Sequence, residues 1–333
     1  MQKTALVGLG YWGKNIFRNL INMIGVHNVV IVDKQEHILS DIKSKFPSLE
    51  VFNHIDGIIS RKDIINVIIA TPTHTHYSLA KKMIQARKNI LIEKPTTTSL
   101  KEALHLQVES KRNKVLIMTD YIFLYHPVVN TIKELIKRGK IGKIKHIDST
   151  RINLGIYQKE TNVLWDLACH DISIVNYFID EKPTHIRAIG RLNMEFLVED
   201  ISYIFLYYKS GLLVQINSSW ASPVKIRKMI IGAEKSMLIY DDLNPLDKLK
   251  VYDYCKSNVR ETTKNELTEY RLGKITSPKI DNTEPLKLVL ADFFESSKNK
   301  SKPKITYEST IDIIKYLEKA HESIKLNGEL VEI

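Results

Sequence analysis

Two short segments of the sequence carry side chains that can move a proton. The first is Glu93-Lys94-Pro95, in which a lysine follows an apolar run and a proline stiffens the turn. A lysine whose pKa is lowered by partial burial and a nearby cation can deprotonate a substrate hydroxyl, and Glu93 could orient it. A single lysine at a strand end is usually structural, so this tripeptide indicates catalysis only together with the second segment.

The second segment runs from Trp165 to Tyr177 and contains Asp166 and His170. On a helix these two residues are four positions apart and share a face. Histidine titrates near neutrality and suits general acid–base work, while Asp166 could orient it or hold a sugar hydroxyl. The alternative is a surface pair that stabilises a helix. Cys169 lies off this face, so we expect it in the core rather than as a nucleophile.

A glycine motif near the N-terminus predicts the kind of cofactor with which the proton-transfer groups act. Gly8, Gly10 and Gly13 form G-x-G-x-x-G between an apolar run, Thr4 to Val7, and a segment of helical pattern, Asn15 to Met23. The three glycines allow a tight turn, close approach of the backbone to a pyrophosphate, and close packing of helix on strand. The helix N-terminus offers N–H groups and partial positive charge to the phosphates. The motif therefore predicts a dinucleotide site, and an empty glycine-rich turn is the alternative.

The side chains around this motif suggest which dinucleotide binds. Tyr11 and Trp12 lie inside it and are expected to border the cofactor. Asp33 ends the next apolar run and could accept hydrogen bonds from the adenosine ribose, which favours NAD. Lys34 follows directly and could instead hold the 2′-phosphate of NADP. Asp33 as a solvated turn residue is the structural alternative.

A third strand end carries the segment from Ala70 to His76. Ligands of open α/β sheets bind at the carboxyl ends of the strands, so Thr71 and the turn at Pro72 are expected to line the dinucleotide. His74 or His76 could reach its ring or ribose. For His74 we favour an exposed residue in a helix-capping loop, whereas for His76 both interpretations stay open.

The spacing of apolar residues places these segments on two domains. Residues 1–120 alternate apolar strands with helices, which indicates a parallel sheet covered on both faces, a Rossmann domain. Residues 121–333 are predicted to form an α+β domain with a largely antiparallel sheet. The strands expected there are 144–152, 185–191, 201–208, 212–219 and 238–240, a helix is expected over 165–179, and 241–285 is read as irregular.

Taken in order, these motifs resemble the glucose–fructose oxidoreductase/inositol dehydrogenase/MocA family over nearly the whole chain. The resemblance implies Lys94 as the catalytic lysine, His170 as the acid–base residue and Asp166 as its supporting carboxylate. It also implies that residues 121–333 form the substrate-binding and oligomerisation domain, whose open sheet often forms a dimer interface. The amino-acid sequences of the glycine motif and of residues 165–171 are similar to those of family members associated with sugar-nucleotide and surface-polysaccharide pathways. The chain departs from the family at Asp120 and Tyr121, after the last Rossmann strand.

The resulting expectation is an NAD(P)-dependent oxidoreductase that transfers hydride between nicotinamide and a secondary hydroxyl or ketone of a pyranose. The expected substrate is a nucleotide sugar of surface-polysaccharide biosynthesis. Either Lys94 or His170 could be the base. One alternative is an enzyme that retains its NAD and uses transient oxidation for elimination or glycoside cleavage; another is a non-catalytic, cofactor-binding regulator. The expected substrate contacts are Tyr121, Arg151, Asn153 and Trp165.

Composition and charge limit the compartment and the partners that we expect for this protein. The chain has 333 residues, of which 44% are hydrophobic and 26% charged, as in globular proteins. Its net charge of +11 is spread along the sequence without a nucleic-acid-binding motif, so we expect no nucleic-acid partner. Two cysteines give neither a disulfide framework nor a metal site. A cytoplasmic homodimer or homotetramer without membrane spans fits these features, and a cleavable signal peptide would destroy the glycine motif.

Overall fold

The computed structural model describes residues 2–154, 161–192, 198–256 and 270–333, without the side chains of 255, 256 and 270–272. The chain forms two compact units. Unit 1 comprises residues 1–125 and 283–318, and unit 2 comprises residues 126–282 and 319–333. Unit 1 thus extends five residues past the predicted boundary at 120, and it also takes in a segment from near the C-terminus.

Unit 1 contains a six-stranded parallel sheet in the order β3-β2-β1-β4-β5-β6. This is the order of doubly wound dinucleotide-binding folds, and the crevice for the ligand opens where it reverses, between β1 and β4. Every residue of β2 is buried, as are four of the five in β1, because helices cover both faces. The strands are β1 (Lys3–Val7), β2 (Val29–Val32), β3 (Glu50–Phe52), β4 (Ile64–Ile69), β5 (Asn89–Glu93) and β6 (Ile117–Asp120).

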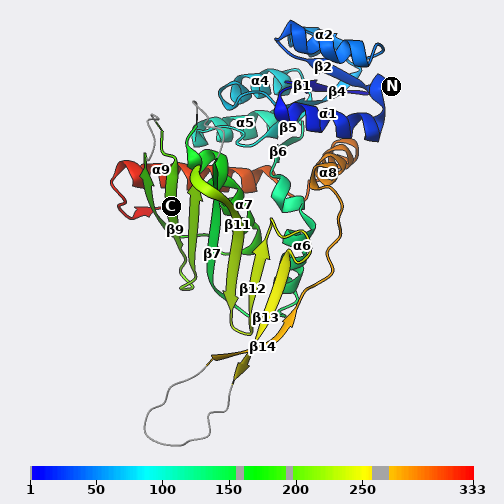
Figure 1. The fold of residues 1–333 in the computed structure, drawn as a ribbon. Helices are drawn as coiled ribbons and strands as arrows, with labels where there is room; N and C mark the ends of the chain where they lie inside the picture. Colours follow the sequence, from blue (N-terminus) through cyan, green and yellow to red (C-terminus); the bar gives the residue numbers. More distant parts are fainter. Residues whose placement is uncertain (1, 155–160, 193–197, 257–269) are drawn as a thin grey trace, which may run out of the picture. The chain divides into compact units, whose positions relative to one another are not determined.

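The helices of unit 1 flank this sheet (Figure 1). Ser99 caps one of them: its hydroxyl accepts a hydrogen bond from the Glu102 amide at 3.5 Å. Helix α8 belongs to unit 1 and contacts α1 there. The carboxylate of Glu284, the residue before α8, accepts hydrogen bonds from Arg18 on α1. The elements are α1 (Tyr11–Ile24), η1 (Val26–Asn28), α2 (Glu36–Lys45), α3 (Asp56–Ile59), α4 (Thr73–Gln85), α5 (Leu100–Asn113), η2 (Ile122–Tyr125), α8 (Pro285–Asn299) and the first part of α9 (Tyr307–Lys325).

Unit 2 is built on a sheet in which nine of the described strands pair in the order β14-β13-β12-β11-β7-β10-β9-β8-β15. All neighbours are antiparallel except β7 and β10. Burial alternates along the strands, since one face is covered and the other is open, as β8 shows residue by residue. The strands are β7 (Ile144–Leu154), β8 (His185–Arg191), β9 (Ile201–Tyr207), β10 (Leu213–Ser219), β11 (Ala221–Ala233), β12 (Ser236–Asp241), β13 (Leu249–Lys256), β14 (Tyr270–Thr276) and β15 (Val331–Glu332).

The helices of unit 2 include α6 (Pro127–Lys137) and α7 (Cys169–Phe178). A π-helical segment, η3 (Leu164–Ala168), precedes α7 and contacts β10. The helix predicted over 165–179 is therefore present, but its first turn takes the wider i→i+5 pattern that often occurs at functional sites. Within the described ranges, none of the helices has the length and apolar character needed to cross a membrane.

The prediction of an irregular segment at 241–285 is also wrong in part. Strand β13 pairs with β12 and β14 inside it, and the long strand β11 was not predicted either. Charged residues on the open face interrupt the apolar runs of these strands, so that their alternation is hidden. The fold class itself is confirmed: a parallel α/β unit and a largely antiparallel α+β unit (Figure 1).

Candidate active site

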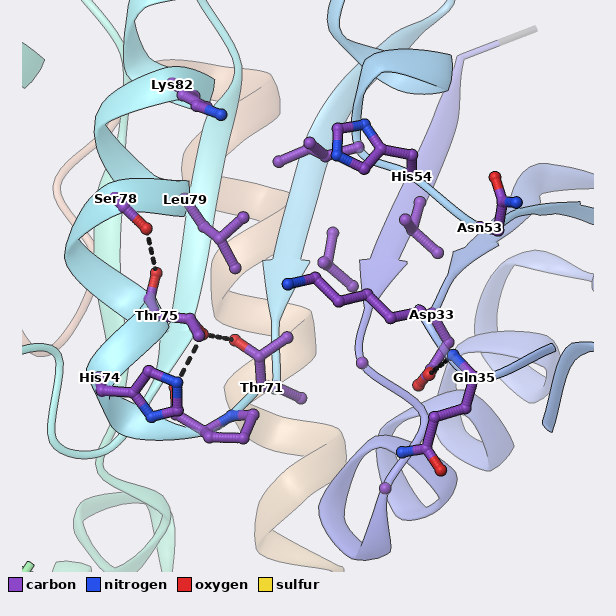
Figure 2. A pocket seen from close by; sticks show the side chains of 18 residues that line it. Asp33, Gln35, Asn53, His54, Thr71, His74, Thr75, Ser78, Leu79 and Lys82 are labelled. Atoms are coloured by element: carbon purple, nitrogen blue, oxygen red, sulfur yellow. Dashed lines mark hydrogen bonds between the residues drawn. The ribbon is translucent and has the colours of Figure 1, made fainter. Parts of the chain in front are cut away.

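A cavity of about 510 Å³ opens at the carboxyl ends of β1, β2 and β4. Figure 2 shows Asp33, Gln35 and Asn53 on one side of it and Thr75, Ser78 and Leu79 of α4 on the other. The cavity thus coincides with the crevice at which doubly wound sheets bind dinucleotides. The residues that line it are Val7, Gly8, Gly10, Val32, Asp33, Lys34, Gln35, Asn53, His54, Ile55, Ala70, Thr71, Pro72, His74, Thr75, Ser78, Leu79 and Lys82.

The glycine motif forms the floor of this cavity, and the backbone around Gly8 and Gly13 leaves no room for a side chain at either position. Gly8 has φ +94°, and a Cβ there would lie 2.5 Å from the carbonyl oxygen of Ala70. A Cβ on Gly13 would lie 2.1 Å from the carbonyl oxygen of Gly8. Gly10 has open space around its α-carbon, so a ligand can approach the backbone there. The cradle therefore fits a pyrophosphate, as a dinucleotide requires.

Helix α1 begins directly at this floor, and its first turn is exposed. The Tyr11 side chain is 81% exposed and Trp12 is 40% exposed, with their ring centroids 5.9 Å apart. The first turn holds no acidic residue, so nothing there offsets the positive end of the helix dipole. Two aromatic rings beside such a helix end can shield a bound phosphate from water.

Asp33 is held in a fixed orientation by the backbone around it. The Leu9 amide donates to its Oδ2 at 2.7 Å. The Gln35 amide donates to its Oδ1 at 2.9 Å, as Figure 2 shows. Each carboxylate oxygen can accept a further hydrogen bond, which suits the two hydroxyls of a ribose. Asp33 is thus more than a solvated turn residue, and Lys34 lines the same cavity.

The loop after β4 and the first turn of α4 contribute hydroxyls to the cavity and a histidine to the interior. Thr71 and Thr75 are linked through their hydroxyls at 2.7 Å, and His74 lines the cavity. His76 is only 1% exposed. Its Nδ1 lies 2.9 Å from the Pro95 carbonyl oxygen, and its Nε2 lies 2.7 Å from that of Thr71. His76 therefore ties the cofactor loop to the loop that carries Lys94.

Lys94 follows the last residue of β5, and its peptide bond to Pro95 is cis. The Lys94 amide donates to Glu93 Oε2 at 3.2 Å. Glu93 is in register with Asp120 on β6, and the two carboxyl groups are hydrogen-bonded. Burial raises the pKa of Glu93 to about 7, and the positive charge of Lys94 lowers it only in part. The lysine thus lies beside a pair of carboxyl groups in contact.

In unit 2, the π-helical segment η3 carries Asp166 just before the helix that carries His170. The Trp220 indole Nε1 donates to Asp166 Oδ2 at 3.0 Å. Trp220 is buried against Val163 and Leu167, which fixes the indole and, through it, the carboxylate. Cys169 is buried, as predicted, and its thiol donates to the Asp166 carbonyl oxygen at 3.4 Å.

The predicted substrate contacts differ in how much of each is accessible. Tyr121 is fully buried in unit 1, and Trp165 is 6% exposed in unit 2. Arg151 is 3% exposed and donates from Nε to Asp171 Oδ2 at 2.7 Å and from Nη2 to Asp171 Oδ1 at 3.1 Å. Asn153 is partly exposed on the same strand as Arg151. A role for Arg151 is therefore tied to its buried partner.

Sequence reasoning missed three residues that position these groups: Trp220, Asp171 and, as a partner of Glu93, Asp120. Asp171 directly follows His170, and its Oδ1 also accepts a hydrogen bond from Ser149 at 2.9 Å. A carboxylate among the buried positions of an apolar helix is a sequence signal for a paired interior cation. Trp220 lies far along the chain from Asp166, so no local pattern connects them. Within the described residues, no cluster of three or more His, Cys, Asp or Glu side chains could hold a metal ion.

Comparison with known proteins places this architecture in a family. Residues 2–121 match the model of the Gfo/Idh/MocA oxidoreductase family, NAD-binding Rossmann fold, and residues 129–238 match the model of its C-terminal domain. The NAD-dependent scyllo-inositol 2-dehydrogenase of Bacillus subtilis is 26% identical over 254 residues, 71% of this chain and 73% of its own. The 2,7-anhydro-N-acetylneuraminate hydratase of Escherichia coli is 23% identical over 292 residues, 82% of this chain and 76% of its own.

The fold agrees with a solved structure as well. UDP-N-acetylglucosamine 3-dehydrogenase from Acidithiobacillus ferrooxidans superposes with a TM-score of 0.81 at 17% sequence identity, covering 98% of each chain. The parallel Rossmann unit and the second, largely antiparallel unit therefore recur together in another protein. By its two matched domains this chain belongs to the Gfo/Idh/MocA family of oxidoreductases, and its cofactor is NAD.

Proposed function

We propose that this chain is a dehydrogenase or reductase that transfers hydride between NAD and a secondary hydroxyl or ketone of a pyranose. The observation that carries the proposal is the joint presence of a dinucleotide cradle with Asp33 beside it, Lys94 at a strand end, and the Asp166–His170 segment. Relatives named for oxidation of a cyclic polyol or a nucleotide sugar support this substrate class. A nucleotide sugar of surface-polysaccharide biosynthesis is the substrate that we propose.

The residues of unit 1 bind the cofactor and set its orientation. The amides at Gly10 and the start of α1 receive the pyrophosphate, and Tyr11 and Trp12 cover it. Asp33 accepts the ribose hydroxyls. Bound NAD supplies the redox chemistry by accepting hydride at C4 of its nicotinamide. His76 contributes to the cofactor site by holding together the two loops that contain Thr71 and Pro95. The remaining residues that we propose to contact the cofactor are Gly8, Gly13, Lys34, Thr71, Pro72, Glu93 and Lys94.

The proton of the substrate hydroxyl is handled by Lys94 and His170. One of them takes the proton during oxidation, and the other holds the oxygen by a hydrogen bond. Asp166, fixed by the Trp220 indole, supports His170 or accepts a hydroxyl of the sugar. Substrate contacts are proposed at Tyr121, Arg151, Asn153 and Trp165, and the pairing with Asp171 makes Arg151 a rigid one.

A second candidate is an enzyme that retains its NAD and oxidises the sugar only transiently to promote elimination. The similarity to a relative named as a hydratase, a reaction without net redox change, favours it specifically. The same residues serve both candidates, because abstraction of the hydroxyl proton and hydride transfer come first in each. The candidates differ in whether reduced cofactor accumulates.

The experiment is a screen of nucleotide sugars and free pyranoses with added NAD or NADP, in which nicotinamide absorbance and product are followed together. Reduced cofactor that accumulates in proportion to product supports the dehydrogenase, whereas product with constant absorbance supports the second candidate. Lys94→Ala and His170→Ala should each lower kcat by about 100-fold or more. Lys62→Ala and His185→Ala are controls elsewhere in the same units, and unchanged turnover in both active-site variants would refute the assignment.

We propose a homodimer or homotetramer that assembles through the open face of the unit 2 sheet. Apolar side chains on this face are well exposed: Ile189 is 39%, Tyr203 41% and Leu213 41% exposed. A monomer rarely leaves such side chains together in water. A cytoplasmic location is proposed with it, in line with the buried thiol of Cys169.

A further inference from the structure

The carboxyl groups of Glu93 and Asp120 meet at the ends of two neighbouring strands in unit 1. Glu93 on β5 and Asp120 on β6 are partners in the parallel register, so their side chains leave the sheet on the same face. A hydrogen bond joins the two carboxyl groups. Two carboxyl groups in contact cannot both ionise near neutral pH, because the charges repel each other. One proton must therefore stay in this pair.

The surroundings decide which of the two carboxyl groups keeps the proton. Asp120 is 3% exposed, and its buried Oδ1 has no hydrogen-bond partner among the residues that the structure describes. A negative charge on that oxygen would be neither solvated nor paired. Glu93 is partly exposed, accepts a hydrogen bond from the Lys94 amide and feels the positive charge of Lys94. The charge is therefore better placed on Glu93, and the proton on Asp120.

The other groups that face the pair do not change this order. Burial, followed by the charge of Glu93 and the hydrogen bond to it, raises the pKa of Asp120 well above its ordinary value. Tyr125, which follows β6, donates to Asp292 on α8 at 2.5 Å, and burial together with this hydrogen bond raises its pKa, so it stays neutral. The hydroxyl of Thr119, the preceding residue of β6, pairs with that of Thr96 and adds no charge. Lys94 is the cation that acts on both carboxyl groups.

We propose that Asp120 is a positioning residue that stays protonated and donates a hydrogen bond to Glu93, so that one carboxylate rather than two acts on Lys94. The inference rests on the proposed role of Lys94 in proton transfer. Each additional carboxylate would hold the Lys94 amine in its charged form and remove it as a proton acceptor.

The protonation state can be measured without any substrate. We expect carbon-13 NMR of protein labelled at the aspartate and glutamate carboxyl carbons to show two coupled resonances, assigned through Asp120→Asn and Glu93→Gln. The Glu93 resonance should titrate near pH 7, and the Asp120 resonance should remain that of a neutral acid at that pH. An ionised Asp120 at pH 7 would overturn the proposal. This result does not depend on whether a sugar is oxidised, so it separates this inference from the proposed function.

Kinetics then test whether the hydrogen bond matters. Asp120→Asn retains a neutral donor, so kcat should stay within about threefold of the unmodified enzyme. Asp120→Ala removes the donor that stabilises ionised Glu93, so the ionisation near pH 7 in the pH–rate profile should move up by about one pH unit. NAD affinity and thermal stability report whether each variant folds. Ser110→Ala, a buried change in the last turn of α5, should leave the profile unchanged.

Opposite outcomes contradict the proposal at defined points. If Asp120→Asn loses activity as severely as Asp120→Ala while both bind NAD, the carboxylate form of Asp120 is required and the assignment of the proton is wrong. If Asp120→Ala keeps both the profile and kcat, Asp120 has no positioning role. If Asp120→Ala does not fold, Asp120→Asn together with the NMR titration decides.

Discussion

The two units place their functional side chains in different parts of a sheet. In unit 1, Asp33, Thr71 and Lys94 follow the carboxyl ends of strands whose interiors are apolar except for Asn66 on β4. In unit 2, Arg151 lies in the interior of β7, and Asp166 and His170 lie on η3 and α7. A parallel sheet covered on both faces leaves polar chemistry to the last residues of its strands, such as Glu93 and Asp120, and to the loops that follow, whereas a sheet with one open face also has room for polar residues within its strands. Unit 1 thus concentrates its chemistry at strand ends and loops, and unit 2 within regular elements.

The units also treat buried charge differently. Unit 1 buries two acids beside one lysine and resolves the conflict by retaining a proton. Unit 2 buries Arg151 with Asp171 as a two-bond ion pair, in which the side chains are each 4% exposed. A retained proton depends on pH near neutrality, but a guanidinium–carboxylate pair does not. We therefore expect the charge state of unit 1 to change with pH near neutrality. We expect the stability of unit 2 to fall when either Arg151 or Asp171 is removed from the ion pair.

The largest effect is expected when the ion pair of unit 2 is broken. Arg151→Met leaves the Asp171 carboxylate buried without its cation and should lower the free energy of unfolding by about 3–5 kcal/mol, measured in urea. Lys133→Met, which removes an ion pair with the 97% exposed Asp180, is the control and should cost less than about 1 kcal/mol. Adding Asp171→Asn to Arg151→Met should restore part of the loss. Equal costs for the two single variants would show that the buried pair is not what holds this face of β7.

An intermediate effect is expected at the glycine cradle of unit 1. A Cβ on Gly13 meets the Gly8 carbonyl oxygen, so Gly13→Ala should destabilise the unit by about 1–3 kcal/mol and weaken NAD binding. Gly10 has φ −70° and open space, so Gly10→Ala should change stability by less than about 1 kcal/mol. Its methyl group should still obstruct the pyrophosphate. Urea unfolding and fluorescence titration with NAD measure both, and unimpaired NAD binding by Gly10→Ala would argue against the cradle.

The smallest effect on folding is expected on the open face of unit 2. Tyr203→Lys should change the unfolding free energy of the monomer by about 0.5 kcal/mol or less, because the side chain is exposed. Analytical ultracentrifugation should nevertheless show a smaller assembly than for the unmodified chain. Val108→Lys, on the 61% exposed side chain of a unit 1 helix, is the matched control. An unmodified chain that sediments as a monomer would refute the proposed interface.

The sequence predicted unit 1 better than unit 2. Runs such as Val29–Val32 and Ile90–Ile92 are apolar throughout, and their ends are marked by Asp33 and by Glu93-Lys94-Pro95. The strands β11, β13 and β14 escaped prediction because their open faces carry charged residues that break up the apolar pattern. The π-helical turn at η3 escaped too, since local sequence favours an ordinary helix and tertiary contacts of Trp220 and β10 act on that segment.

The sequence by itself determined the family, the fold class, the NAD-binding crevice and the residue types available for proton transfer. These follow from local patterns: glycine spacing, uninterrupted apolar strands and polar residues at strand ends. Only the tertiary structure decided which side chains meet. It paired Glu93 with Asp120, Arg151 with Asp171, and Asp166 with Trp220. The reason is that strand register and helix packing bring together residues distant in the chain, and the protonation and orientation of a buried group depend on those neighbours.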